Sequence, residues 1–401
     1  MKKFLLLLIF AIVFVPGCVP AEFRLRPLPE NPAAPIVVAA FLPLSGNNRV
    51  FAEQMQEGLL AAEAYINRNR GIAGRKLKLR VIDTAGTAEG TGKALKKAEL
   101  YGAVAAVAGY GTKEVSMLIR NADRLRMPMV IPLATSDYHT QTSPFIYRNC
   151  FTDMQQMEML ASYIHHWRKM SRGAIITDHY GDDEYTGGIT RNFTQAIRDL
   201  GGKITINTIV PSDAELTANQ IIELLATDPE FILVSSSGKR AAKTIAELRK
   251  SGFRGIICGP ESWDEDEICE NLKGVKVGEC VFPAFFNPAN ESREFREFKK
   301  DFRKRFYHNP GACETQCFDA LVFLAIGLGN AGNLFEFDAN WRKIVNFPGA
   351  AAYYSMGKKG TIDRTVYLKS FDIDYGANMQ ISSRVFRKMQ YSKLKDYQII
   401  E

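Results

Sequence analysis

Short apolar runs alternate with amphipathic segments along most of the chain. Apolar and β-branched residues concentrate in the runs 36–40, 77–82, 104–107, 129–131, 174–177, 204–210, 231–234, 255–258 and 279–282. Between such runs, residues 51–67 and 157–167 repeat apolar side chains at the spacing of one helix face. This alternation of strands and helices predicts an α/β protein whose parallel sheets are covered by helices on both faces.

Nine strands are more than one doubly wound sheet of this size would comfortably hold. We therefore expect two Rossmann-like lobes, each built around a parallel central sheet. In such sheets a ligand binds in the crevice at the carboxyl ends of the strands. The polar residues that follow each strand are accordingly the first candidates for a binding site.

The N-terminus has the features of a secretion signal. Lys2 and Lys3 precede the apolar segment 4–15, which is shorter than the roughly 20 residues that span a bilayer but suits a signal peptide. The segment ends in Val-Pro-Gly-Cys18, which resembles a bacterial lipobox except for its proline. We expect residues 1–18 to be a signal peptide with lipobox and Cys18 to be lipidated. The alternative is an ordinary cysteine after a conventional cleavage site.

Residues 19–35 contain five prolines and little periodicity, which predicts a flexible tether between the anchor and the folded body. The folded body should therefore begin near Ile36. No other apolar run is long enough to span a membrane, so the rest of the chain is expected to be soluble and exported.

Composition and charge narrow the function classes. The 401 residues carry 51 Lys and Arg against 44 Asp and Glu, and the resulting charge of +7 is spread along the chain. Loss of Lys2 and Lys3 with the signal would lower it to +5, so a nucleic-acid partner is not expected. The sequence has no nucleophile elbow and no clustered metal ligands, and the glycines of 86–93 have the wrong spacing for a phosphate loop. We expect no enzyme activity, no cofactor and no metal.

Six further cysteines remain in the exported body, so disulfides can form there. They are Cys150, Cys258, Cys269, Cys280, Cys313 and Cys317. The three between 258 and 280 lie in one strand–helix–strand stretch and are the first candidates. Cys313 and Cys317, with His308 nearby, suggest a metal site only weakly because a second ligand pair is missing. Buried thiols or one disulfide are favoured for that pair.

Polar residues follow several of the predicted strands. After 104–107 comes the turn Gly109-Tyr-Gly111-Thr112, where a dinucleotide fingerprint is broken because position 114 is Glu. Free N–H groups and a hydroxyl at this helix start suit a carboxylate, although Thr112 could simply cap the helix. Similar clusters follow the later strands, at 133–136, 178–188, 235–238 and 259–263. The acidic run 264–267 is expected to be a solvated helix start.

Several motifs in order resemble one family. They are Phe-Leu-Pro-Leu-Ser-Gly at 41–46, the segment 71–83, Val-Ala-Gly at 107–109, Ile-Pro-Leu-Ala-Thr at 131–135, Gly-Pro-Glu at 259–261, and 318–320 with 331–332. Together they span nearly all of residues 36–375. The chain resembles the type I periplasmic binding proteins, and within them the branched-chain amino acid (Leu/Ile/Val) binding proteins of ABC transporters. The tail after about residue 380 has no counterpart that we can place.

The resemblance implies two lobes that close on a ligand and are joined by three chain crossings. By this reasoning the first lobe comprises 36–150 and 285–346, and the second 151–284 and 347–401. The hinge is expected near Cys150, Pro283 and Pro348, with prolines at two of the three crossings.

The resemblance also implies site residues. Thr112 and Thr135 match positions that bind an α-carboxylate. The Leu133–Ala134–Thr135 loop and Glu261 match those that hold the ammonium. The ammonium would contact the Leu133 carbonyl, the Thr135 hydroxyl and the Glu261 carboxylate.

Two further positions face the ligand in the family. Tyr185 matches the covering aromatic, with Tyr180 as the alternative if the register shifts. Ser237 stands where the Leu/Ile/Val binders place a second tyrosine. This change would widen or polarise the side-chain pocket, which leaves open whether the ligand is Leu, Ile or Val.

The function implied is that of an extracytoplasmic substrate-binding lipoprotein of an ABC transporter. It would bind a small, branched-chain-like amino acid on the periplasmic side, as a monomer anchored to a membrane by lipid, and present it to the permease. The alternative is a ligand-sensing or partner-regulating lipoprotein of the same fold that is not coupled to transport.

Overall fold

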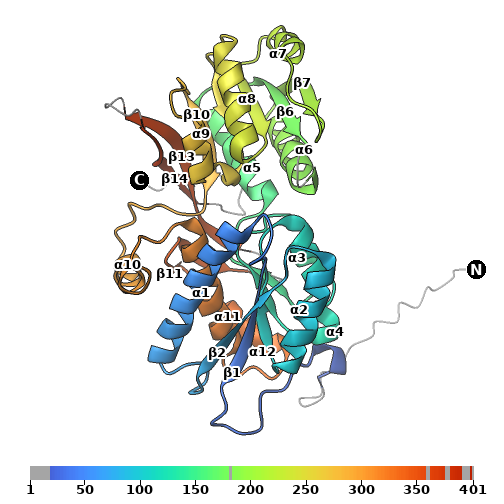
Figure 1. The fold of residues 1–401 in the computed structure, drawn as a ribbon, viewed down its shortest axis with the longest axis vertical. Helices are drawn as coiled ribbons and strands as arrows, with labels where there is room; N and C mark the ends of the chain where they lie inside the picture. Colours follow the sequence, from blue (N-terminus) through green and yellow to red (C-terminus); the bar gives the residue numbers. More distant parts are fainter. Residues whose placement is uncertain (1–18, 180–182, 358–361, 375–379, 391–397, 400–401) are drawn as a thin grey trace, which may run out of the picture.

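The computed structural model describes residues 19–179, 183–357, 362–374, 380–390 and 398–399. Two α/β lobes lie one above the other and meet at a narrow junction (Figure 1). Each has a central parallel sheet with helices packed on its faces, as the alternation of strands and helices predicted. All nine strands predicted from the sequence are present.

The first lobe contains a five-stranded parallel sheet in the order β2-β1-β3-β4-β5. Its strands are β1 (Ile36–Leu42), β2 (Leu77–Asp83), β3 (Ala105–Val107), β4 (Met129–Ile131) and β5 (Ile146–Arg148). Its helices are α1 (Arg49–Arg68), α2 (Ala88–Leu100), α3 (Thr112–Ile119), α4 (Ala122–Leu125), α10 (Arg293–Phe306), α11 (Ala312–Leu328) and α12 (Leu334–Trp341). The central strand β1 is almost wholly buried, which explains why it reads as a continuous apolar run.

The second lobe contains five parallel strands in the order β10-β9-β8-β6-β7. They are β6 (Arg172–Asp178), β7 (Lys203–Val210), β8 (Phe231–Ser235), β9 (Ile256–Cys258) and β10 (Cys280–Ala284). Its helices are α5 (Asp153–Ser162), which continues as a π-helical turn Tyr163–Trp167, α6 (Asp183–Asp199), α7 (Ala218–Leu225), α8 (Gly238–Lys250) and α9 (Asp266–Asn271). Helix α5 begins with a capping box formed by Thr152 and Gln155. This capping box fixes the start of the helix directly after the first crossing.

The C-terminal strands are antiparallel and extend the second sheet. They are β11 (Phe347–Pro348), β12 (Tyr353–Met356), β13 (Ile362–Asp374), β14 (Gln380–Gln390) and β15 (Gln398–Ile399). In Figure 1, β13 and β14 rise from the junction along the second lobe. The tail that the sequence left unplaced, after about residue 380, therefore includes a strand paired with Thr365–Asp374 of β13.

The third crossing does not lie at Pro348, where we expected it. Residues after Pro348 stay with the first lobe because the Asp319 carboxylate of α11 accepts the N–H groups of Ala350 and Ala351 at 2.7 and 2.9 Å. The Tyr354 hydroxyl donates to the same carboxylate at 3.0 Å. The chain passes to the second lobe only along β13.

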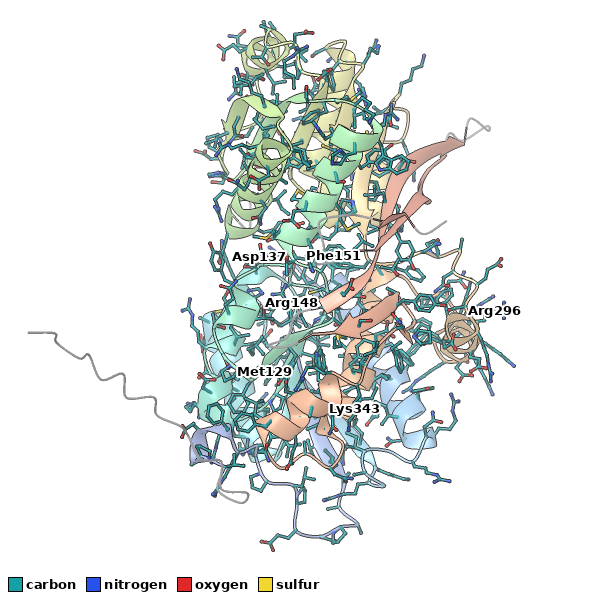
Figure 2. All side chains as sticks on the ribbon, turned by 180° about the vertical axis from the view of Figure 1, so that it is seen from behind. Met129, Asp137, Arg148, Phe151, Arg296 and Lys343 are labelled. Atoms are coloured by element: carbon teal, nitrogen blue, oxygen red, sulfur yellow. The ribbon has the colours of Figure 1, made fainter. Side chains whose placement is uncertain are left out.

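One arginine joins the three crossings. The guanidinium of Arg364, on β13, donates to the Asn149 carbonyl at 2.9 Å and to the Phe285 carbonyl at 2.6 Å. Phe151 and Phe285 stack with ring centroids 4.1 Å apart, and Arg364 lies against both rings. Arg364 is 1% exposed. Figure 2 shows Phe151 and Arg148 at the level of the junction.

Residues 19–35 pack along the first lobe instead of forming a contact-free tether. The Leu25 side chain is buried and its N–H donates to the Gly332 carbonyl at 3.2 Å. The Arg75 guanidinium donates to the carbonyls of Pro29, Asn31 and Ala34 at 2.8–3.2 Å. Prolines remove donors from this segment but leave its carbonyls available, and Arg75 uses them. The signal segment and Cys18 lie outside the described residues.

The cysteines expected as disulfide partners are free thiols, as are the other three of the described body. Cys258 and Cys280 lie on neighbouring strands, but the register pairs Cys258 with Val281 and Cys280 with Ile257. A shift of one residue turns two side chains to opposite faces of a sheet. The two thiols accordingly lie in different apolar clusters. Among the described residues, no helix combines the length and the apolar character that crossing a membrane requires.

Candidate ligand-binding site

Hydrogen bonds to its backbone carbonyls hold the loop after β4 in place. Arg148, 1% exposed, donates to the carbonyls of Thr135 and Ser136 at 3.2 and 2.7 Å. The N–H of Asp153 also donates to the Thr135 carbonyl at 2.9 Å. Leu133 and Ala134 of the same loop are buried.

The Thr135 hydroxyl is the unusual group of this loop. Thr135 is 1% exposed, and the hydroxyl lies near the carboxyl groups of Asp153 and Glu261. Among the described residues it has no hydrogen bond of ordinary geometry. Buried hydroxyls are normally hydrogen-bonded, so this hydroxyl is available to bond to a ligand atom.

The start of α3 contains a carboxyl group of the chain itself. Gly111, with φ of +88°, occupies the N-cap position, so Thr112 is the first helical residue and does not cap the helix. Thr112 is 3% exposed, and Glu114, in the first turn, is 4% exposed. The Thr84 hydroxyl donates to Glu114 Oε1, and burial raises the pKa of Glu114 to about 7. The positive end of the α3 dipole is therefore already close to one carboxyl group, that of Glu114.

The second lobe supplies Glu261 directly after β9. Its N–H donates to Gln156 Oε1 at 3.1 Å, and Gln156 Nε2 donates to Asp153 Oδ1 at 3.2 Å. Burial raises the pKa of Glu261 to about 7, and the neighbouring side chains of Gln156, Tyr185 and Thr135 oppose this shift. Glu261 Oε2 has no hydrogen-bond partner among the described residues.

Tyr185, the expected covering aromatic, lies beside Glu261. Burial raises the pKa of its phenol well above the usual value, and the next largest cause is the charge of Glu261. Tyr180, the alternative, lies outside the described residues. Ser237 is exposed at the start of α8, and none of its described contacts reaches Glu261 or Thr135.

Sequence reasoning missed two residues of α5 in this cluster. Asp153 is 2% exposed, and its pKa is raised well above the usual value by burial and then by the charge of Glu261. Gln156 is fully buried between Asp153 and Glu261. The Thr152-x-x-Gln155 capping signal locates the helix start but does not show that its first turn faces the cleft.

The acidic run 264–267 is not wholly solvated, contrary to expectation. Glu265 is half-buried, and the Tyr110 hydroxyl of the first lobe donates to its Oε1 at 3.4 Å. The Tyr110 ring stacks on Phe51 with centroids 4.7 Å apart. Burial raises the pKa of Glu265 to about 8, and the charges of Glu267 and Glu261 act in the same direction. Asp264 binds the buried Lys369 ammonium at 2.6 Å.

A second contact joins the lobes beside this cluster. Asp137, at the junction in Figure 2, accepts from Asn192 Nδ2 of α6 at 2.9 Å. It also accepts the N–H of Met154 at 3.2 Å. The first lobe thus contacts α5, α6 and the loop after β9.

The weak metal signal near His308 does not involve the thiols. His308 Nε2 lies 2.8 Å from Glu57 Oε2, and Glu314 Oε2 accepts the N–H of Gly311 at 3.0 Å. Among the described residues the possible ligand group here is Glu57, His308 and Glu314. These side chains complete an ion pair and a helix cap.

The chain forms two lobes joined by a hinge, and polar residues of both lobes face each other beside that hinge. This arrangement is typical of a solute-binding protein. The chain belongs to the periplasmic binding protein family, whose profile matches residues 35–363. The family and the fold are those of substrate-binding proteins and not of enzymes.

Two curated relatives are similar over part of their length. Leu/Ile/Val-binding protein homolog 3 of Brucella melitensis is 24% identical over 237 residues, which are 58% of this chain and 63% of the relative. Leu/Ile/Val-binding protein BraC3 of Rhizobium johnstonii is 29% identical over 189 residues, 46% of this chain and 50% of the relative. The chain thus aligns with less than two thirds of either.

Solved structures share the fold over most of both chains. The isoleucine complex of the branched-chain amino acid binding protein LivJ from Streptococcus pneumoniae has a TM-score of 0.74 at 19% identity, covering 88% of this chain and 99% of that one. A solute-binding protein of Rhodopseudomonas palustris in complex with 3,4-dihydroxybenzoic acid has a TM-score of 0.71 at 17% identity, covering 89% and 98%. The fold therefore accepts different ligands, and the choice depends on site residues.

Proposed function

We propose that the protein is the substrate-binding component of an ABC transporter and holds an amino acid between its lobes. The observation that carries the proposal is the Glu261 carboxyl group, whose Oε2 is buried without a partner. The Thr135 hydroxyl of the other lobe lies near it and is also without an ordinary hydrogen bond. The two groups together suit an ammonium. The names of both curated relatives support an amino-acid ligand.

The α-ammonium would contact Glu261, the Thr135 hydroxyl and the Leu133 carbonyl. The α-carboxylate would approach the N–H groups at the start of α3, next to Thr112. Glu114 at that helix start has a pKa of about 7, so its neutral form can accommodate a second carboxylate there. Tyr185 would cover the ligand from the second lobe.

Closure would follow from contacts made by both lobes. A ligand that binds Thr135 and Glu261 at once favours the arrangement in which these residues face each other. The crossings at Arg364 allow such a motion without separating the lobes. The closed protein would then present its ligand to a permease.

Export and anchoring form a second part of the proposal. The N-terminal signal and Cys18 would place the protein on the periplasmic side of the envelope as a lipid-anchored monomer. Growth with a labelled fatty acid tests this part, because the Cys18→Ala chain should remain unlabelled. Labelling of that variant would contradict the proposal.

Calorimetry on the purified full-length chain with a panel of amino acids tests binding. At least one amino acid should bind, and Glu261→Gln and Thr135→Val should each weaken it by roughly 1.5–3 kcal/mol, as for a lost charged hydrogen bond. Glu270→Gln, an exposed change on α9, should leave the affinity unchanged. Absence of binding by every amino acid would overturn the proposal.

A further inference from the structure

The cleft contains more acid than one amino acid can neutralise. Glu261 acts electrostatically on both Asp153 and Glu265, and none of the three forms an ion pair with Lys or Arg among the described residues. A simple amino acid brings one ammonium, and its own carboxylate adds another negative charge. Burial keeps these carboxyl groups largely protonated in the ligand-free protein. A ligand with a second cationic group could pair with one of them in its ionised form, which a simple amino acid cannot do.

Neighbouring cationic side chains do not balance this charge. The guanidinium of Arg148 donates to the carbonyls of Thr135 and Ser136, and its charge lowers the pKa of Asp153 only slightly against the effect of burial. His139 is 1% exposed, and burial followed by the charge of Arg148 lowers its pKa to about 4. It is therefore neutral under ordinary conditions.

Unpaired atoms point to a ligand in the same place. Thr135 Oγ1, Glu261 Oε2 and Ser262 Oγ are buried and have no hydrogen-bond partner among the described residues. Thr135 is 1% exposed, so bulk water does not satisfy its hydroxyl. The three atoms come from both lobes, as expected for groups that a bound molecule would bridge.

Glu265 marks where a second cation would lie. It follows Glu261 by four residues and contacts the Tyr110 hydroxyl of the facing lobe at 3.4 Å. The stacked rings of Tyr110 and Phe51 form an aromatic surface beside it. A carboxylate next to aromatic rings is a favourable environment for an ammonium or guanidinium.

On the basis of the proposed function, we propose that the ligand is an amino acid whose side chain ends in an amine or guanidinium. Its α-ammonium binds at Glu261, Asp153 and Thr135. Its side-chain cation binds between Glu265 and the rings of Tyr110 and Phe51. The uncharged branched-chain amino acids are then poor ligands.

Selectivity of the purified full-length chain tests the inference. Calorimetry with lysine, arginine and ornithine against leucine, isoleucine and valine should give at least one basic amino acid that binds tenfold or more tightly than leucine. Glu265→Gln should remove most of that tenfold preference and leave leucine binding little changed. Glu270→Gln on the neighbouring helix is the matched control.

The outcomes separate the inference from the proposed function. Leucine binding as tightly as every basic amino acid overturns the inference and leaves amino-acid binding intact. Binding of putrescine, a diamine without a carboxylate, in the absence of any amino-acid binding overturns both, as does no binding at all. Wild-type selectivity decides the question even where Glu265→Gln fails to fold.

Discussion

Buried polar groups are hydrogen-bonded at the hinge, whereas several in the cleft have no hydrogen-bond partner among the described residues. At the hinge, the Arg364 guanidinium bonds to carbonyls of two crossings and to Gln316 Oε1 at 2.8 Å. Asp319 nearby accepts two backbone N–H groups and the Tyr354 hydroxyl. In the cleft, atoms of Thr135, Glu261 and Ser262 are buried without partners.

This difference distinguishes structural from ligand-binding polar groups. Burying a polar group costs free energy unless it is hydrogen-bonded, so a completed network supports the fold by itself. An incomplete network reduces stability until a ligand completes it. Mutations in the two regions should therefore act on different quantities: stability at the hinge and affinity in the cleft.

The largest effect on stability is expected from Arg364→Met. The change leaves the Asn149 and Phe285 carbonyls and Gln316 Oε1 without their buried cationic donor, which should lower the free energy of unfolding by about 3–5 kcal/mol. Urea unfolding measures it. Arg296→Met, an exposed change on α10 that Figure 2 shows away from the junction, should alter stability by less than about 0.5 kcal/mol. If both changes lowered the free energy of unfolding equally, the hydrogen bonds of Arg364 would not be what stabilises the hinge.

An intermediate effect concerns pH. The unfolded chain releases the Glu261 proton near pH 4.5, whereas the folded chain holds it to about pH 7. Stability of the ligand-free protein should therefore fall as the pH rises through this window and level off above it. Glu261→Gln should reduce the fall by about 1–3 kcal/mol. Urea unfolding at pH 5 and pH 8 checks this, and an unchanged fall in the variant would show that Glu261 is not held protonated by burial.

The smallest effect is expected across the cleft at Asn192. Asn192→Ala removes the hydrogen bond to Asp137 that joins α6 to the first lobe. Affinity for the ligand should fall by about 0.5–1.5 kcal/mol, because closure loses one contact, while the unfolding midpoint stays nearly constant. Calorimetry and urea unfolding measure the two quantities. A loss of stability without a loss of affinity would assign Asn192 to the fold.

The sequence predicted most of the fold because the central strands, such as β1, β8 and β10, are buried on both faces and read as apolar runs. It did not predict β5, a three-residue strand that ends in Arg148 and has no apolar periodicity. It placed the third crossing at a proline, whereas the position of the crossing depends on hydrogen bonds of Asp319 and Arg364 to residues that are distant from them in sequence.

The candidate site was predictable where residues follow strands. Thr135, Glu261 and Tyr185 do so, and the structure brings them together. Asp153 and Gln156 were missed because they begin a helix that faces the cleft only after the chain has crossed. Glu265 was taken for a solvated residue because nothing in an acidic run indicates which carboxylate packs against Tyr110.

The fastening of residues 21–35 to the first lobe also has a mechanical consequence. Their described contacts with Arg75, Arg126 and Gly332 all lie on that lobe. Any attachment upstream of Val19 would therefore hold the first lobe in place. If the lobes close as proposed, the second lobe would move about Arg364 relative to the first, and this motion would set the orientation of the site towards the point of attachment.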